Sequence, residues 1–412
     1  MNCIKLQGIL LSVILTHSIS TTSVAANNTQ NISQETNISL NQMLERALLT
    51  SPAIKAAQEK LEAELARSRS LGQALYNPEL ELEYENAEEV TKSIGLNQQI
   101  DWQGKRSSNQ NLGRVRVDIA RLKLTITRNG FMGEVARAIS TYTKNQEMLS
   151  IRNRILESAT RLKLFAEKQH SSGDSTLKEL QTARLALLRA RTDKNNSYAD
   201  FLRARQVLMA LTGREANQWK PVNFTEHALP SLDQVSQQLP ALKLTRLQFL
   251  KQKAQVRVVE KKYVDDPTIG VKYGKEGKND LFGVKLSMPL PVRRSNRFDL
   301  LAAKREMQAA DFELDNQERV LEANLAANHS RISALQKSWQ EWDSQGDQSL
   351  STQYDLLNSL LENGELSTLN YLLEIEQLLR TEESIVELKF NLETAWIDWF
   401  EQTNGFNAWI EK

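Results

Sequence analysis

Two pairs of short segments in this sequence alternate apolar and polar residues, and the second pair follows the first by about 190 residues. The first pair is YNPELELEYE at 76–85 and KSIGLNQQIDWQGKR at 92–106. The second pair is DDPTIGVKYG at 265–274 and LFGVKLSMPLPVRR at 281–294. Alternation with a period of two predicts strands, and each pair predicts a hairpin. A long helical pattern follows each hairpin, so the sequence predicts one helix–hairpin–helix unit repeated in tandem.

The two faces of the first predicted strand carry different chemistry. Leu80, Leu82 and Tyr84 alternate with glutamates. Successive side chains of a strand point to opposite faces, so these glutamates are expected to share one face. We therefore predict an acidic ladder on the polar face of the sheet, formed by Glu79, Glu81, Glu83 and Glu85.

The sequence around the predicted hairpins is typical of long helices. Proline is absent from 79–220 and from 292–412, and both stretches are rich in Leu, Ala, Glu, Gln, Lys and Arg. These residues are good helix formers, whereas proline interrupts a helix. Apolar residues recur at steps of three and four, which predicts seams between packed helices. The seam residues are Val115, Ile119, Leu122 and Ile126 in the first half, and Leu325, Asn328, Ile332, Leu335 and Trp339 in the second.

The lengths of the predicted helices indicate how they are arranged. A helix at about 105–170 would be roughly 100 Å long at 1.5 Å per residue. The two helices that flank it, at about 52–75 and 176–211, would together reach roughly 90 Å. The second half repeats this match, with helices at about 240–263 and 367–401 against one at 297–362. We therefore predict that two shorter helices stack end to end along each long helix, forming a cylinder about 100 Å tall.

The expected fold is mainly α with a small β part, divided into two repeats. The first repeat is expected at 39–212 and the second at 239–402, with a connection at 213–238 and a tail at 403–412. The predicted bounds of the strands are about 78–86 and 93–102 in the first repeat, and about 268–274 and 281–290 in the second. The predicted helical hairpin tips are at about 171–177 and 362–368.

The beginning of the chain reads as a cleaved export signal at 1–26, followed by a flexible segment at 27–38. Lys5 gives the positive start, residues 6–18 form a short apolar stretch, and 23–26 is a small-residue cleavage site. The apolar stretch is shorter than the roughly 20 residues that a membrane-spanning helix needs. Cys3 is the only cysteine and lies before the apolar stretch, so a lipid anchor at the cleavage point is not expected.

Composition excludes several kinds of site. The net charge is +1 with 25% charged residues, so no nucleic-acid partner is expected. Without cysteine after the signal, neither a disulfide nor a thiolate metal site is expected. The sequence holds no HExxH, GxSxG or P-loop pattern, so we expect no enzyme activity, no catalytic residue, no cofactor and no bound structural metal.

The predicted strands have the length of tilted transmembrane strands, about nine or ten residues. A soluble antiparallel sheet alternates in the same way, so the pattern alone leaves both readings open. Export, the long helices and the lack of other sequence to cover the sheet favour membrane strands. Four strands cannot close a barrel, and open edges are not tolerated in lipid, so copies of the chain are expected to assemble.

The sequence resembles the TolC family of outer-membrane channels over nearly all of the expected mature chain. The resemblance rests on the duplicated Asn-Pro and Asp-Pro strand openings, Gly-Lys-Arg after the second strand and Pro-Leu-Pro after the fourth. It rests also on the turns SSGDSTLKELQTAR at 171–184 and ENGELSTLNYL at 362–372. The segments ELELEYEN and QQIDWQGKR are most similar to the branch that serves heavy-metal exporters of the cobalt–zinc–cadmium and copper type.

This resemblance implies a homotrimer with a 12-stranded β-barrel in the outer membrane and a helical barrel in the periplasm of a Gram-negative bacterium. It implies a passive exit duct in a tripartite, proton-driven efflux system, with a periplasmic membrane-fusion adaptor and an inner-membrane RND pump as partners. The acidic ladder would then face the lumen. The resemblance also assigns the hairpin tips to adaptor docking, through Gly173, Thr176, Glu179, Gly364 and Ser367.

Alternatives to a metal channel stay open from the sequence. A drug, small-molecule or type I secretion channel would have the same fold. A periplasmic adaptor would carry one helical hairpin between split β-rich halves, in place of a tandem duplication. A coiled-coil scaffold would lack the paired alternating strands.

Overall fold

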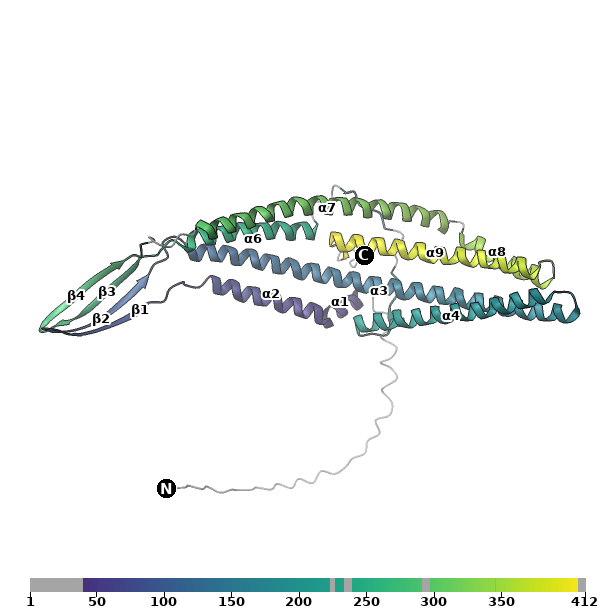
Figure 1. The fold of residues 1–412 in the computed structure, drawn as a ribbon, viewed down its shortest axis with the longest axis horizontal. Coiled ribbons are helices and arrows are strands. Elements are labelled where there is room, and N and C mark those ends of the chain that lie inside the picture. Colours follow the sequence, from purple (N-terminus) through teal and green to yellow (C-terminus); the bar gives the residue numbers. More distant parts are fainter. Residues whose placement is uncertain (1–39, 223–226, 233–238, 291–296, 345, 407–412) are drawn as a thin grey trace, which may run out of the picture.

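The computed structural model describes residues 40–222, 227–232, 239–290, 297–344 and 346–406. The predicted export signal at 1–26 and the segment at 27–38 lie outside these residues, as does 407–412 of the predicted tail. The described chain is elongated, with a β-sheet at one end and two helical hairpin tips at the other (Figure 1). The fold is mainly α with a small β part, as predicted from the sequence.

Each half of the chain has helices on both sides of a β-hairpin. In the first half the elements are α1 (Leu40–Thr50), α2 (Pro52–Leu71), β1 (Glu79–Asn86), β2 (Val90–Gln99), α3 (Lys105–Ser172), α4 (Leu177–Thr212) and the short 3-10 helix η2 (Ala216–Gln218). In the second half they are α6 (Pro240–Lys262), β3 (Thr268–Glu276), β4 (Asn279–Ser287), α7 (Arg297–Asp343), α8 (Gly346–Glu362) and α9 (Thr368–Thr403).

The predicted stacking of short helices along long ones is confirmed. Helices α2 and α4 lie one after the other along α3, and α6 and α9 lie one after the other along α7 and α8 (Figure 1). Pro52 and Pro240 occupy the first turns of α2 and α6, where a missing N–H is tolerated. The Asp101 carboxylate, four residues before α3, accepts hydrogen bonds from the first two backbone N–H groups of that helix, those of Lys105 and Arg106, at 2.7 and 2.8 Å.

Several predicted bounds differ from the structure, and one helix was missed. The helix predicted at 297–362 is two helices, α7 and α8, and at the start of α8 the backbone of Gly346 approaches the Trp342 ring so closely that a Cβ would lie 2.2 Å from it. Strand β2 begins at Val90 and ends at Gln99, so it lies earlier in the sequence than the predicted 93–102. Helix α1 was not predicted, although its buried residues Met43, Leu44, Ala47 and Leu48 have helical spacing.

The buried core lies between the helices and not on the sheet. Its main part is where α9 ends against α3 and α7, and it includes Trp396, Trp399 and Phe400. The Trp396 and Phe400 rings stack with their centroids 5.6 Å apart. The predicted seam residues Leu325 and Ile332 belong to this core. A second cluster, which includes Leu162, Tyr371 and Ile375, holds α3, α8 and α9 together nearer the tips.

The four strands form one antiparallel sheet in the order β1-β2-β3-β4. The central pairing, β2 with β3, joins the two repeats, with Gly95 opposite Lys272. In the described residues, no helix is long and apolar enough to cross a bilayer.

A buried ion pair fixes the place where the sheet meets the helices. The Asp266 carboxylate is fully buried and lies 2.8 Å from Lys105 Nζ at the start of α3. The Tyr76 hydroxyl donates a hydrogen bond to the same carboxylate oxygen at 2.6 Å. Burial, reinforced by this hydrogen bond, raises the pKa of Tyr76 to about 12. Three segments that are far apart in the sequence are therefore joined at one point.

Candidate functional sites: the charged strand face and the helical hairpin tips

The four glutamates of β1 lie on one face of the sheet, together with lysines from the second repeat. The strand register puts Glu81, Gly95 and Lys272 in one row across three strands. Glu79, Asn97, Gly270 and Lys285 form the neighbouring row. The polar face therefore carries glutamates on the edge strand β1 and lysines on β3 and β4.

Two of the four glutamates are neutralised within the chain. Glu83 lies 3.1 Å from Lys272 Nζ, and the Ser93 hydroxyl donates a hydrogen bond to it at 2.8 Å. Glu81 accepts a hydrogen bond from the Asn97 amide at 2.7 Å and lies 3.8 Å from Lys285 Nζ. The described residues place no lysine or arginine within 4.0 Å of Glu79 or Glu85. The face is therefore less acidic than the glutamate ladder alone indicates.

Glycines on both neighbouring strands make room for Lys272. A Cβ at Gly283 would lie 3.0 Å from the Lys272 Cγ, and one at Gly95 would lie 3.3 Å from its Cβ. Side chains at either position would push the lysine away from Glu83. Sequence reasoning did not find this arrangement, although the alternation of glycine with lysine on β3 and β4 is its visible sign.

The opposite face of the sheet is apolar, and the described residues of the chain form no layer over it. Leu82 is 72% exposed and Leu286 is 74% exposed. Large apolar side chains of all four strands share this face: Leu80, Leu82, Tyr84, Ile94, Leu96, Val271, Tyr273, Phe282, Val284 and Leu286. An exposed apolar face of this extent indicates contact with a membrane or another protein.

Both predicted hairpin tips reverse direction at a glycine with positive φ. Gly173 ends α3 with φ of +84°, and Gly364 follows α8 with φ of +71°. Both values lie in the left-handed region, which side chains with a Cβ rarely adopt. These glycines allow the chain to reverse direction within a few residues.

The first residue after each reversal caps the next helix. The Thr176 hydroxyl accepts a hydrogen bond from the Glu179 N–H at 3.3 Å, and the Glu179 carboxylate accepts one from the Thr176 N–H at 3.1 Å. Ser367 accepts one bond, from the Asn370 N–H at 3.3 Å. The first tip thus has a complete capping box and the second a single cap.

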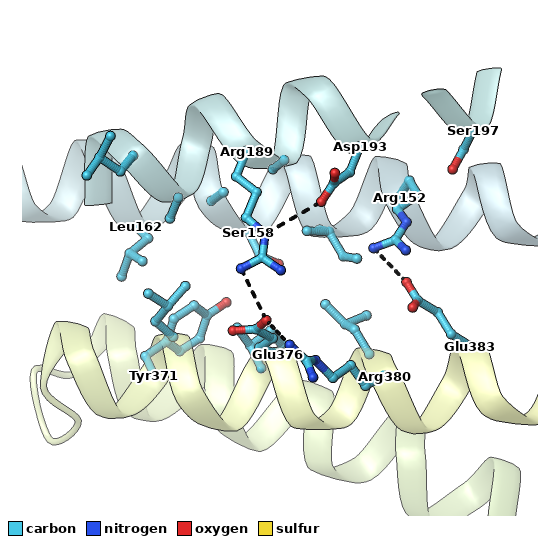
Figure 2. A pocket seen from close by; sticks show the side chains of 18 of the residues that line it. Arg152, Ser158, Leu162, Arg189, Asp193, Ser197, Tyr371, Glu376, Arg380 and Glu383 are labelled. Atoms are coloured by element: carbon cyan, nitrogen blue, oxygen red, sulfur yellow. Dashed lines mark hydrogen bonds and ion pairs between the residues drawn. The ribbon is translucent and has the colours of Figure 1, made fainter. Parts of the chain in front are cut away.

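A cavity of about 770 Å³ lies behind the tips, between α3, α4 and α9 (Figure 2). Ion pairs cross it: Glu376 of α9 lies 3.6 Å from Arg189 of α4 and 2.7 Å from Arg380. Arg152 of α3 lies 2.8 Å from Glu383 of α9, and burial raises the pKa of this carboxyl. Three arginines and four carboxylates line the cavity, and their ion pairs join α4 to α9 and α3 to α9. This cavity could not be predicted from the sequence, because its residues come from three distant segments.

Comparison with known proteins assigns this fold. The family model for "Outer membrane efflux protein" matches residues 43–214. Residues 43–214 are therefore similar to this family. Its members are channel proteins, which agrees with the elongated helical body and the β-sheet at its end.

A curated relative and solved structures agree with this assignment. The cobalt-zinc-cadmium resistance protein CzcC of Cupriavidus metallidurans is 24% identical over 274 residues, which is 64% of this chain. The match spans 66% of CzcC, just under two thirds of its length. The structure of VceC from Vibrio cholerae has a TM-score of 0.73 at 16% identity, covering 88% of this chain and 95% of VceC. The structure of CusC has the same TM-score at 14% identity, covering 88% and 91%. These structural likenesses concern the fold.

The described residues hold no group of three or more His, Cys, Asp or Glu side chains that could bind a metal ion. The candidate sites are therefore the polar strand face and the helical hairpin tips.

Proposed function

We propose that this protein is the outer-membrane exit duct of a tripartite, proton-driven efflux system and works as a homotrimer. The observation that carries this proposal is the sheet itself. It has one exposed apolar face, one charged face, and unpaired edges at β1 and β4. Such a sheet is stable in lipid only when further strands pair with both edges. Three copies would supply 12 strands, with the apolar face toward lipid and the charged face toward a water-filled lumen.

The helical body supports the same assembly. Large apolar side chains on α4 and α7 have no cover in one chain, among them Leu185 and Leu188 on α4, and Phe298 and Phe312 on α7. Helices that expose such residues along their length are suited to pack against helices of neighbouring copies. The helical part would then form a barrel in the periplasm, after export and cleavage of the signal.

The tips are proposed to contact the partner proteins. They lie at the far end of the body from the sheet (Figure 1), where a periplasmic adaptor and an RND pump of the inner membrane would meet the channel. Leu177 and Leu369 are exposed beside the caps Thr176 and Ser367. Exposed leucines beside a rigid turn give an adaptor an apolar anchor with a defined position.

We propose heavy-metal cations as the substrate class, such as zinc, cobalt, cadmium, copper or silver. The similarity to a cobalt-zinc-cadmium resistance protein supports this choice. The lumen-facing glutamates support it as well, because carboxylates attract cations and hold them weakly when they are hydrated and spread along a wide pore. A duct needs weak contacts, since tight binding would slow passage.

Deletion of the gene in its native host tests this proposal. The deletion strain should lose resistance to metal salts while its sensitivity to drugs and dyes stays unchanged, and the wild-type gene should restore resistance. A variant with Gly173→Val and Gly364→Val should insert as a trimer and fail to restore resistance. Sensitivity to drugs alone would assign the channel to small-molecule efflux. Restoration by the double tip variant would remove the docking role of the tips.

A further inference from the structure

The two open edges of the sheet carry opposite charge on their polar sides. The polar side of β1 presents only glutamates, whereas the polar side of β4 presents a single charged side chain, Lys285. Within the chain Lys285 reaches toward Glu81 at 3.8 Å, leaning over two intervening strands. Its side chain remains 57% exposed, so it is free to take a partner on its open side.

The internal repeat indicates which strands pair at these edges, because equivalent strands already pair inside the chain. Strands β1 and β3 are equivalent, since Pro78 and Pro267 open them, and β2 and β4 are equivalent as the second strands of their hairpins. The pairing of β2 with β3 inside the chain therefore corresponds to a pairing of β4 with β1 of a second copy. The central row of the internal pairing is Gly95 opposite Lys272. The equivalent residues are Lys285 on β4 and Glu83 on β1.

We propose that β4 of one copy pairs antiparallel with β1 of the next, in the register that sets Lys285 directly opposite Glu83 of the second copy. This inference rests on the proposed trimer and adds the residues that fix its seam. Directly opposite residues on one face have Cβ atoms about 4.5–5.5 Å apart, within reach of an ion pair. The acidic and basic edges recognise each other, and like edges repel.

The faces of the sheet agree with this register independently of charge. The same register sets Leu286 opposite Leu82 and Val284 opposite Tyr84, all of them on the apolar face. A slip by one residue would turn every side chain of one strand to the wrong face. Slips by two residues keep the faces, but they set Lys285 opposite Glu81 or Glu85. Glu83 is favoured because it is equivalent to Lys272, which pairs with Gly95 inside the chain, and Gly95 is equivalent to Lys285.

Cysteine cross-linking in the full chain tests the register. In a Cys3→Ser background, Lys285→Cys is combined with Glu83→Cys, Glu81→Cys or Glu85→Cys, and membranes are oxidised. A disulfide requires Cα atoms within about 7 Å, which the directly opposite pair satisfies and the diagonal pairs exceed or barely reach. Residues on β1 and β4 of the same chain are three strand spacings apart, about 14 Å, so every disulfide formed joins two copies. We expect covalent trimers mainly with the Glu83 pair.

A second set on the lipid face keeps the charges intact. Leu286→Cys should cross-link with Leu82→Cys and weakly with Leu80→Cys or Tyr84→Cys. Each single-cysteine variant is the control for random collision, and native mass measurement reports the assembly of every variant. Trimers that cross-link best through Glu81 or Glu85 would overturn the register and leave the proposed channel standing. Absence of trimers in the wild-type chain would overturn the proposed function itself.

Discussion

Helices α4 and α9 are the same element in the two repeats, and they show which features the duplication kept. Both have 36 residues, and both begin at a hydroxyl cap, Thr176 or Ser367. Both end at a residue in the left-handed region, Gly213 with φ of +68° and Asn404 with φ of +57°. The backbone frame is therefore shared between the repeats.

The charges placed on this frame differ between the repeats. Glu393 is buried in α9 at the place where α4 has Leu202. Asp266 is buried before β3, whereas Asn77, its counterpart before β1, is exposed. On the polar face of the sheet, Glu83 of β1 corresponds to Lys272 of β3. The two repeats therefore share a backbone architecture but differ in where they place charged residues. Each of these charged residues can be tested by comparison with the residue at the equivalent position of the other repeat.

The largest difference in the effect of a substitution on stability is expected at the residues that precede β1 and β3. Asp266→Ala removes the only anion within 4.0 Å of Lys105 among the described residues and leaves a mostly buried ammonium unpaired. We expect the free energy of unfolding to fall by about 3–5 kcal/mol. Asn77→Ala, at the exposed counterpart, should change it by about 0.5 kcal/mol or less. Urea unfolding in detergent measures both, and equal effects would mean that Asp266 is not the anchor of the junction.

The buried carboxyl of α9 should make stability depend on pH. Glu393 is 3% exposed and faces Ser140 of α3, with Lys389 and Glu147 nearby. Burial raises the pKa of Glu393 to about 7. Since the folded pKa lies above the unfolded one, its stabilising contribution is complete below about pH 4.5 and is lost as pH rises through 7.

Glu393→Gln should therefore remove a stability difference of about 2 kcal/mol between pH 5 and pH 8. Leu202→Gln, at the same place on α4, should lower the unfolding free energy equally at both pH values. Unfolding curves at the two pH values provide the measurement. A pH dependence that survives Glu393→Gln would assign it to other groups.

A smaller difference in local stability is expected when the helix caps at the two tips are removed. Thr176→Ala breaks a capping box, whereas Ser367→Ala breaks a single cap bond. We expect the first change to destabilise its tip by about 1 kcal/mol and the second by less. Hydrogen exchange of the first-turn amides of α4 and α9 measures the stability of each tip separately. Thr176→Ser, which keeps the hydroxyl, should retain the protection from exchange that Thr176→Ala loses. The opposite order would show that neighbouring contacts, and not the caps, hold the turns.

The smallest expected effect concerns ion selectivity. Changing Glu79, Glu81, Glu83 and Glu85 to Gln should weaken cation preference, and changing Lys272 and Lys285 to Gln should strengthen it. The effects are modest because charges in a wide pore are screened over about 8–10 Å at physiological salt. The reversal potential of single channels under a salt gradient measures both at low ionic strength. If neither set moves it, the polar face does not line the conducting pore.

The sequence was sufficient for the features that follow from periodicity and turn chemistry. Alternation identified the strands, and glycine followed by a hydroxyl residue identified the tips at Gly173 and Gly364. It was insufficient where side chains from distant segments decide the structure. The pairing of Glu81 and Glu83 with lysines depends on strand register. The burial of Asp266 depends on Lys105 and Tyr76, and the Asp-Pro and Gly-Lys-Arg motifs do not by themselves predict that contact.

The central claim is that the four strands of one chain are one third of a closed barrel. The native mass of the protein extracted from outer membranes in mild detergent tests it most directly. We expect a single species with three times the mass of the mature chain, stable on dilution. A monomer whose strands are nevertheless protected from protease would contradict the account, because the β1 and β4 edges would then be closed without a second copy.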